Sequence, residues 1–184
     1  MADEEKTSIG TDGRSLLLQL TNSINISVHD ILAVIQELEN QKLFAEDIQT
    51  LAGEWLLLWT SGTKKYENLT KKSLAAPIIT NPIIINNSSK TQIIQCFDIH
   101  QNRIENQVIF PFGSLTVAGS FIYTPKKRIE FIFNKISLQI GVLPILNIPL
   151  GNWAKGWLQT TYLDSHIHIE RGDRGGVSVY LKQS

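Results

Sequence analysis

The sequence has one cysteine, no net charge and no long apolar run, and each of these absences excludes a class of protein. Because Cys96 has no cysteine partner, the chain forms no internal disulfide and no cysteine-based zinc site, which fits a reducing compartment. Lysine plus arginine and aspartate plus glutamate number 17 each, so no overall field attracts nucleic acid, and no nucleic-acid partner is expected. No stretch reaches the roughly 18 apolar residues of a membrane-spanning helix, so any membrane contact is expected to be peripheral.

What the sequence does contain is enough apolar material for a folded core. Its 184 residues are 42% hydrophobic, which predicts one domain over residues 1–184. The first residues, Met1 to Lys6, are acidic and lack an apolar segment, so neither a signal peptide nor a transit peptide is expected. Residues 1–13 are expected to be flexible, 14–50 to be helical and 53–182 to form a β-barrel.

Two helical signals precede the β region: a short apolar run at 16–20 and a clearer amphipathic segment from Val28 to about Lys42. Ser27 is placed to cap the second helix, with Asp30 three residues further on. Apolar residues recur there on one stripe, namely Val28, Ile31, Leu32, Ile35 and Leu38. We expect this helix to lie against the barrel or to close one of its ends.

From Gly53 onward the apolar period changes from 3.6 to 2, and turn residues recur at short intervals. The pattern predicts eight strands, at 54–61, 91–100, 103–112, 114–123, 128–138, 156–163, 165–171 and 177–182. Tight turns join most of them, which indicates an antiparallel meander. The predicted fold class is therefore mainly β, an up-and-down barrel of about eight strands, because closure removes the exposed edges.

One face of these strands collects the large apolar side chains, which are expected to line the barrel. The aromatic candidates for a ligand-binding interior are Trp59, Phe97, Phe121, Tyr123, Phe131 and Phe133. On the last two strands the same alternation places Ile167, Ile169, Val177, Val179 and Leu181 inward. An eight-stranded barrel is either filled by its own side chains or holds one small ligand, and both alternatives stay open.

Two apolar stretches, 75–85 and 141–150, are broken by prolines, which argues against central strands in both. Apolar loops of this kind are normally shielded from water by another surface. Three alternatives are open for them: lids across a mouth of the barrel, contact with a membrane surface, or packing on the barrel wall.

Two short motifs are expected to shape one end of the barrel. Gly53 and Trp55 open the first strand, and Arg171 and Gly172 end the strand before the last turn. We expect the Arg171 guanidinium to lie over the Trp55 indole and close that end. Asp164, which stands in a tight turn, is expected to accept backbone hydrogen bonds rather than to act as a base.

No catalytic residue, metal site or cofactor is predicted. His166, His168 and Glu170 alternate along one strand and share a face, a geometry suited to a metal. Because the intervening isoleucines take the inward face, the histidines are expected on the solvated outside. Cys96 and His100 lie about 13 Å apart on one extended strand, too far for a thiol–imidazole pair. The chain is expected not to be an enzyme.

The segments Gly53-x-Trp55-x-Leu57-x-Trp59-Thr60-Ser61 and Thr161-Tyr162-Leu163-Asp164-x-x-Ile167-x-Ile169-x-Arg171-Gly172-Asp173 together resemble the plastid lipid-associated protein family, also called PAP/fibrillin. The resemblance covers about residues 14–182. It departs from the family pattern at two positions: His168 stands where a second arginine is usual, and Trp59 where tyrosine is commoner. Any role that needs a pair of arginines is therefore not expected here.

The resemblance implies a lipocalin-like fold and a non-catalytic function. The implied function is binding of a hydrophobic small molecule, an isoprenoid-type lipid, quinone or carotenoid, at thylakoid membranes or lipid bodies. The alternative is a structural coat of such lipid surfaces without an internal ligand. The absence of a transit peptide indicates either a cyanobacterial member on the cytoplasmic side of the thylakoid, or a mature plant form in the plastid stroma or plastoglobules. No oligomeric state is predicted.

Overall fold

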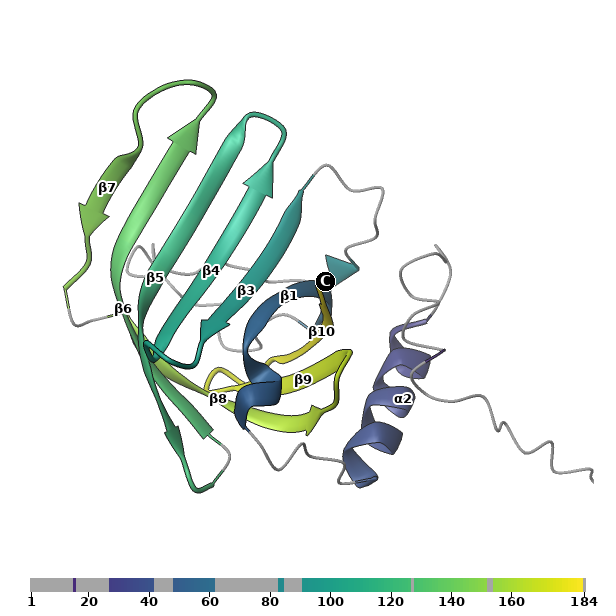
Figure 1. Ribbon diagram of the computed structural model, residues 1–184. Helices are drawn as coiled ribbons and strands as arrows, with labels where there is room; N and C mark the ends of the chain where they lie inside the picture. Colours follow the sequence, from purple (N-terminus) through teal and green to yellow (C-terminus); the bar gives the residue numbers. More distant parts are fainter. Residues whose placement is uncertain are drawn as a thin grey trace, which may run out of the picture.

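The structure is a computed structural model, and it describes residues 15, 27–41, 48–61, 83–84, 91–126, 128–151 and 154–183. Eight antiparallel strands close into a ring in the order β1 (Gly53–Thr60), β3 (Gln92–Asp98), β4 (Arg103–Phe110), β5 (Gly113–Thr124), β6 (Arg128–Ile140), β8 (Lys155–Leu163), β9 (Ile167–Gly172) and β10 (Val177–Lys182). The last strand, β10, pairs back onto β1. The predicted lipocalin-like, up-and-down antiparallel barrel is confirmed (Figure 1).

Two short strands that the pattern did not predict flank this ring. β2 (Ile83–Ile84) pairs with the end of β1, and β7 (Leu146–Pro149) pairs with the distal half of β6. Both come from the proline-broken stretches, and both are edge strands, where a proline removes no needed ladder hydrogen bond. All four residues of β7 are exposed, so this part of the second stretch does not pack on the barrel wall, although Leu150 after it packs against the buried core.

The ring is complete at one end of the molecule. β6 pairs with β8 only through Arg128 to Ile132, and beyond that point its partner is β7. Consequently β3 to β7 continue past the ring as a tall curved sheet (Figure 1). We call the enclosed side of the barrel the lumen.

One helix, α2 (Val28–Asn40), packs on the outside of the ring beside β9 and β10 (Figure 1). Its first turn is capped as predicted, since the Ser27 hydroxyl accepts a hydrogen bond from the Asp30 backbone N–H at 3.2 Å. The predicted stripe is wrong at two positions, because Val28 and Leu32 are 42% and 43% exposed. The helix buries Ile31, Val34, Ile35 and Leu38. The predicted helical run at 16–20 lies outside the described residues.

The buried apolar residues form two separate cores. The lumen core contains Leu51, Trp55, Leu57, Phe97, Ile104, Val117, Phe121, Ile129, Phe133, Ala154, Leu163 and Tyr180. The outer core joins the buried face of α2 to Trp59, Tyr162, Ile167, Ile169, Val177 and Val179. One stretch of the barrel wall is therefore buried on both of its faces.

This second core corrects the predicted orientation of β9 and β10. The side chains expected inward, Ile167, Ile169, Val177 and Val179, lie in the outer core, and Leu181 packs against it. The residues between them consequently face the lumen. Trp59 is also in the outer core, because a register shift between Leu57 and Trp59 in the β1–β10 pairing reverses the alternation of β1.

Candidate functional site

Five of the six aromatic residues predicted for the interior gather in the lumen. Phe97 and Phe121 meet edge to face with ring centroids 5.7 Å apart, and Phe131 and Phe133 lie 4.8 Å apart. Tyr123 and Phe131 are only partly buried and pack against the lumen core. The sixth residue, Trp59, lies outside the lumen. That these rings contact a ligand stays a prediction.

The closed end of the barrel is built around Trp55. A turn of 3₁₀ helix, η1 (Ile48–Leu51), precedes β1, and Gly53 joins the two with φ of 104°, a conformation that favours glycine. The Trp55 indole N–H donates to the Leu51 carbonyl at 2.8 Å. The Lys182 ammonium lies 4.3 Å from the centroid of the Trp55 ring and donates to the carbonyls of Thr50 and Ala52.

The expected contact between Arg171 and Trp55 is therefore wrong. Arg171 extends to the other side of β9, where Nε and Nη2 donate to the two carboxylate oxygens of Glu39 in α2 at 2.9 and 2.7 Å. Although partial burial opposes it, hydrogen bonding by Arg171 lowers the pKa of Glu39. The cation over the indole comes from Lys182, whose side chain alternates with the outer-core residues of β10 and so faces the lumen.

The tight turns around β9 are held as the residue types suggest. Asp164 Oδ1 accepts from the backbone N–H groups of His166 and Ile167, each at 2.6 Å, and Oδ2 accepts from the Tyr162 hydroxyl at 2.9 Å. The Gly172 N–H donates to the Gly176 carbonyl at 3.0 Å, which closes the last hairpin. These contacts give Asp164 and Gly172 structural roles in the turns.

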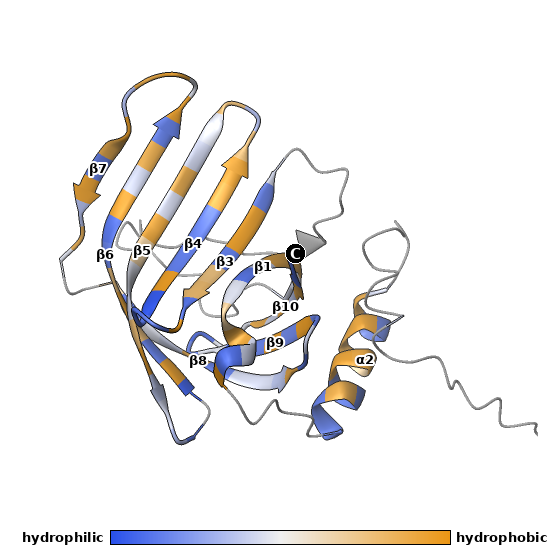
Figure 2. Cartoon of the chain, in the orientation of Figure 1, coloured by the Kyte–Doolittle hydropathy of each residue, from blue (hydrophilic) through white to orange (hydrophobic). Residues whose placement is uncertain are grey.

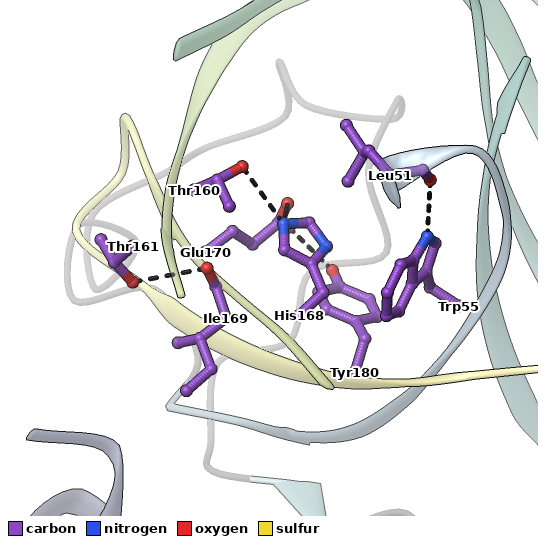
Figure 3. Close-up of polar contacts among 8 residues, drawn as sticks. All are labelled: Leu51, Trp55, Thr160, Thr161, His168, Ile169, Glu170 and Tyr180. Carbon is purple, nitrogen blue, oxygen red and sulfur yellow. Dashed lines mark hydrogen bonds and ion pairs between the residues drawn. The ribbon is translucent and has the colours of Figure 1, made fainter. Parts of the chain in front are cut away.

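Of the three residues expected on the solvated face of β9, His166 is exposed, but His168 and Glu170 are buried and face the lumen. Thr160, His168, Glu170 and Tyr180 are buried and face one another across the lumen (Figure 3). Gln95, also buried, acts on Glu170 from β3, and we call these five residues the lumen polar cluster. The Tyr180 hydroxyl donates to Glu170 Oε1 at 2.9 Å, and Thr160 Oγ1 lies 3.3 Å from His168 Nε2. Figure 3 also shows Ile169 pointing away from this cluster, toward the helix.

Burial sets the charge of these groups. Desolvation raises the pKa of Glu170 to about 7, although hydrogen bonds from Tyr180 and Gln95 work against it. Desolvation, together with the nearby Lys182 ammonium, lowers the pKa of His168 to about 3, so the imidazole is neutral at neutral pH. The sequence does contain a signal for this cluster. His168 and Glu170 alternate with apolar residues on β9, as Tyr180 and Lys182 do on β10, so the polar side chains of both strands fall on one face.

A second feature is an exposed apolar edge at the end of the molecule away from the closed end. The turn between β4 and β5 meets the turn after β6, since the Gly141 N–H donates to the Phe112 carbonyl at 2.8 Å. Seven large apolar side chains are 45–101% exposed here: Phe112, Ile140, Val142, Leu143, Ile145, Leu146 and Ile148. We call this the apolar rim, and Figure 2 shows its hydrophobic colour in β7 and in the loop that joins β6 to β7.

Charge is missing from the segments that form the apolar rim. Neither 106–125 nor 136–154 contains an aspartate, glutamate, lysine or arginine. Contiguous exposed apolar surface of this kind marks an interaction site.

Within the described part of the chain, no helix is long and apolar enough to cross a membrane. The same residues contain no group of three or more histidine, cysteine, aspartate or glutamate side chains arranged to hold a metal.

Comparison with known proteins places these features in context. The PAP_fibrillin family model matches residues 9–181. The chain is 24% identical to a light-induced chloroplastic protein of Solanum tuberosum, with 84% of this chain and 60% of the relative covered. It is 28% identical to probable plastid-lipid-associated protein 12 of Arabidopsis thaliana, with 75% and 34% covered.

A third relative is a chromoplast-specific carotenoid-associated protein of an Oncidium hybrid cultivar, 22% identical, with 91% of this chain and 64% of the relative covered. The chain thus spans between 34% and 64% of the length of these three relatives. No solved structure matches it significantly.

Proposed function

Because the chain belongs to the PAP_fibrillin family, we propose that it is a non-catalytic protein that docks on a plastid or thylakoid lipid surface through its apolar rim. The observation that carries this proposal is the set of seven large apolar side chains that are 45–101% exposed at one end of the barrel. Relatives named as plastid-lipid-associated proteins support the same class of partner.

The size of the apolar rim is sufficient for reversible binding. Transferring one large aliphatic or aromatic side chain from water contributes about 1.5–3 kcal/mol. Three such side chains together contribute about 4 kcal/mol or more, which corresponds to roughly a thousand-fold partition into lipid. Because the rim carries no charge, this binding should need no anionic lipid and should be insensitive to salt.

Flotation with uncharged phosphatidylcholine vesicles tests the docking surface. Leu143, which is 60% exposed, and Ile122, which is 68% exposed, offer a matched pair, because Ile122 lies near the opposite end of β5. Leu143→Asp should reduce the vesicle-bound fraction at least ten-fold, whereas Ile122→Asp should leave it unchanged. Equal effects of the two substitutions, or binding abolished by salt, would contradict the proposal.

The lumen favours a second function, carriage of an isoprenoid-type lipid, quinone or carotenoid. Its wall is aromatic, and Tyr123 and Phe131 are partly uncovered at its margin. Relatives named as carotenoid-associated support this chemistry. Purification from a pigment-containing host, extraction with organic solvent and mass spectrometry should yield a stoichiometric apolar molecule. A folded protein that repeatedly yields none would leave the docking role alone.

A further inference from the structure

The lumen polar cluster continues along the lumen wall onto β3 and β4, as a strip of polar side chains within an apolar core. Gln95 on β3 hydrogen-bonds the Glu170 side chain and is paired in register with Asn106 on β4. Asn106 is only partly buried, whereas Gln95, His168 and Glu170 are between 97% and fully buried, with exposures of 2%, 0% and 3%. The strip therefore runs from a partly open margin to the deepest part of the lumen.

Polar atoms along this strip lack hydrogen-bond partners within the protein. Six buried side-chain nitrogen or oxygen atoms are unpartnered among the described residues, and four of them lie here: Gln95 Oε1, Asn106 Oδ1, His168 Nδ1 and Glu170 Oε2. Leaving such a group unsatisfied in the protein interior is costly. Four in one strip point to a group that enters the lumen and supplies the missing bonds.

The chemistry of these four atoms selects the group. The amide oxygens of Gln95 and Asn106 only accept hydrogen bonds, and so does an ionised Glu170 carboxylate. The bound group must therefore donate. The ammonium of Lys182 lies 4.3 Å from the centroid of the Trp55 ring, which itself lies beside the His168 ring, so it repels a second cation. An uncharged donor remains, and a hydroxyl fits best because it can also accept from a protonated Nδ1 of His168.

We propose that this strip is a recognition site for the hydroxyl end of an otherwise apolar isoprenoid-type molecule. The proposal rests on the carriage function proposed above for the lumen. Aromatic rings frame the site, with Trp55 and Phe97 centroids 5.4 and 6.2 Å from the His168 ring. A hydroxyl-ended ligand therefore binds more tightly than its ether or hydrocarbon counterpart, which leaves the acceptors without a donor.

Displacement of Nile red from the full-length protein by farnesol, farnesyl methyl ether and farnesane tests this selectivity. Farnesol should bind at least ten-fold more tightly than the methyl ether. Gln95→Met, which keeps the length of the side chain and removes its acceptor, should reduce that ratio below three-fold. Gln107→Met makes the same change at the neighbouring register position of β4, on the opposite face of the strand, and should leave the ratio unchanged.

The outcomes separate the two proposals. If none of the three compounds displaces the dye, lumen carriage itself fails. If all three bind equally, carriage stands and the hydroxyl site is overturned, with ordered water satisfying the strip. A ratio that persists in Gln95→Met also overturns the site. Should that variant not fold, Asn106→Leu tests the same strip at its partly exposed end, with the same expected loss of selectivity.

Discussion

Arg171 and Glu39, 132 residues apart in the chain, form a two-pronged ion pair that ties β9 to α2. Glu39 is the more buried partner, since its side chain is 16% exposed against 48% for Arg171. The pair lies at the edge of the outer core, where α2 covers β9. Arg171, which was expected to close the barrel over Trp55, therefore fixes the helix on the outside of the barrel instead.

This relationship predicts a measurable coupling between helix and barrel. Arg171→Ala should lower the free energy of unfolding by about 1 kcal/mol, a modest amount because the guanidinium is half exposed and screened by solvent. In a double-mutant cycle with Glu39→Ala, the coupling energy from denaturant titration should be about 0.5–1 kcal/mol. Arg171→Lys should recover only part of it, because lysine cannot form the two-pronged contact. A coupling energy of zero would show that the Arg171–Glu39 pair does not link the helix to the barrel.

The barrel itself was predictable, because period-two alternation and tight turns recur from Gly53 to Lys182 whatever surrounds them. The orientation of β9 was not. Alternation shows that Ile167 and Ile169 face an apolar environment. It does not show whether that environment is the lumen core or the outer core. With α2 on the outside, four consecutive residues of β9 are buried, so the polar side chains of His168 and Glu170 mark the lumen.

Trp59 illustrates the other limit of reading a face from alternation. One register shift between Leu57 and Trp59 moves every later side chain of β1 to the opposite face. A second shift, between Thr160 and Tyr162 in the β8–β9 pairing, sends Tyr162 to the outer core while Leu163 stays in the lumen. Bulges of this kind have no residue signature in β1 or β8, so counting by two fails there.

Lys182 is predicted to stabilise the closed end of the barrel. Lys182→Met keeps the length of the side chain and removes both the contact with the Trp55 ring and the donors to Thr50 and Ala52. The expected loss in unfolding free energy is about 1–2 kcal/mol. Lys155→Met, at an exposed position on β8, is the matched control and should be neutral. Equal stability of the two variants in thermal or denaturant unfolding would refute the role.

Gly119 is predicted to be irreplaceable for a steric reason. A Cβ at this position would lie 1.9 Å from the Ile132 carbonyl oxygen and 2.6 Å from the Phe133 Cα, so the β5–β6 pairing would have to separate. Gly119→Ala should destabilise the protein by about 3 kcal/mol or more. Gly172→Ala is the control, because its Cβ would meet only Leu158 Cδ2 at 3.9 Å. A Gly119→Ala protein that unfolds at the wild-type denaturant concentration would contradict the strand spacing.

The raised pKa of Glu170 predicts that stability falls as the pH rises from about 4.5 through 7. Its pKa is about 7 in the folded protein against an ordinary value of 4.5, so between these values the folded protein holds a proton that the unfolded chain has released. The stabilising contribution of this proton is complete below pH 4.5 and is lost as the pH rises through 7. His168 acts in the opposite direction and mainly below pH 6.5, because its pKa is lowered from 6.5 to about 3.

The window from pH 6.5 to 8 is dominated by Glu170, and the smaller opposite contribution of His168 cancels in a comparison with Glu170→Gln. Across it the wild-type protein should lose about 1 kcal/mol of unfolding free energy through this group. Glu170→Gln keeps an acceptor for the Tyr180 hydroxyl and cannot titrate, so its stability relative to wild type should rise by that amount over the same window. Urea titrations of both proteins at the two pH values measure the difference, in which the other titrating groups cancel. Parallel curves for the two proteins would show that Glu170 is already ionised in the lumen at pH 6.5, and burial would then not control its charge.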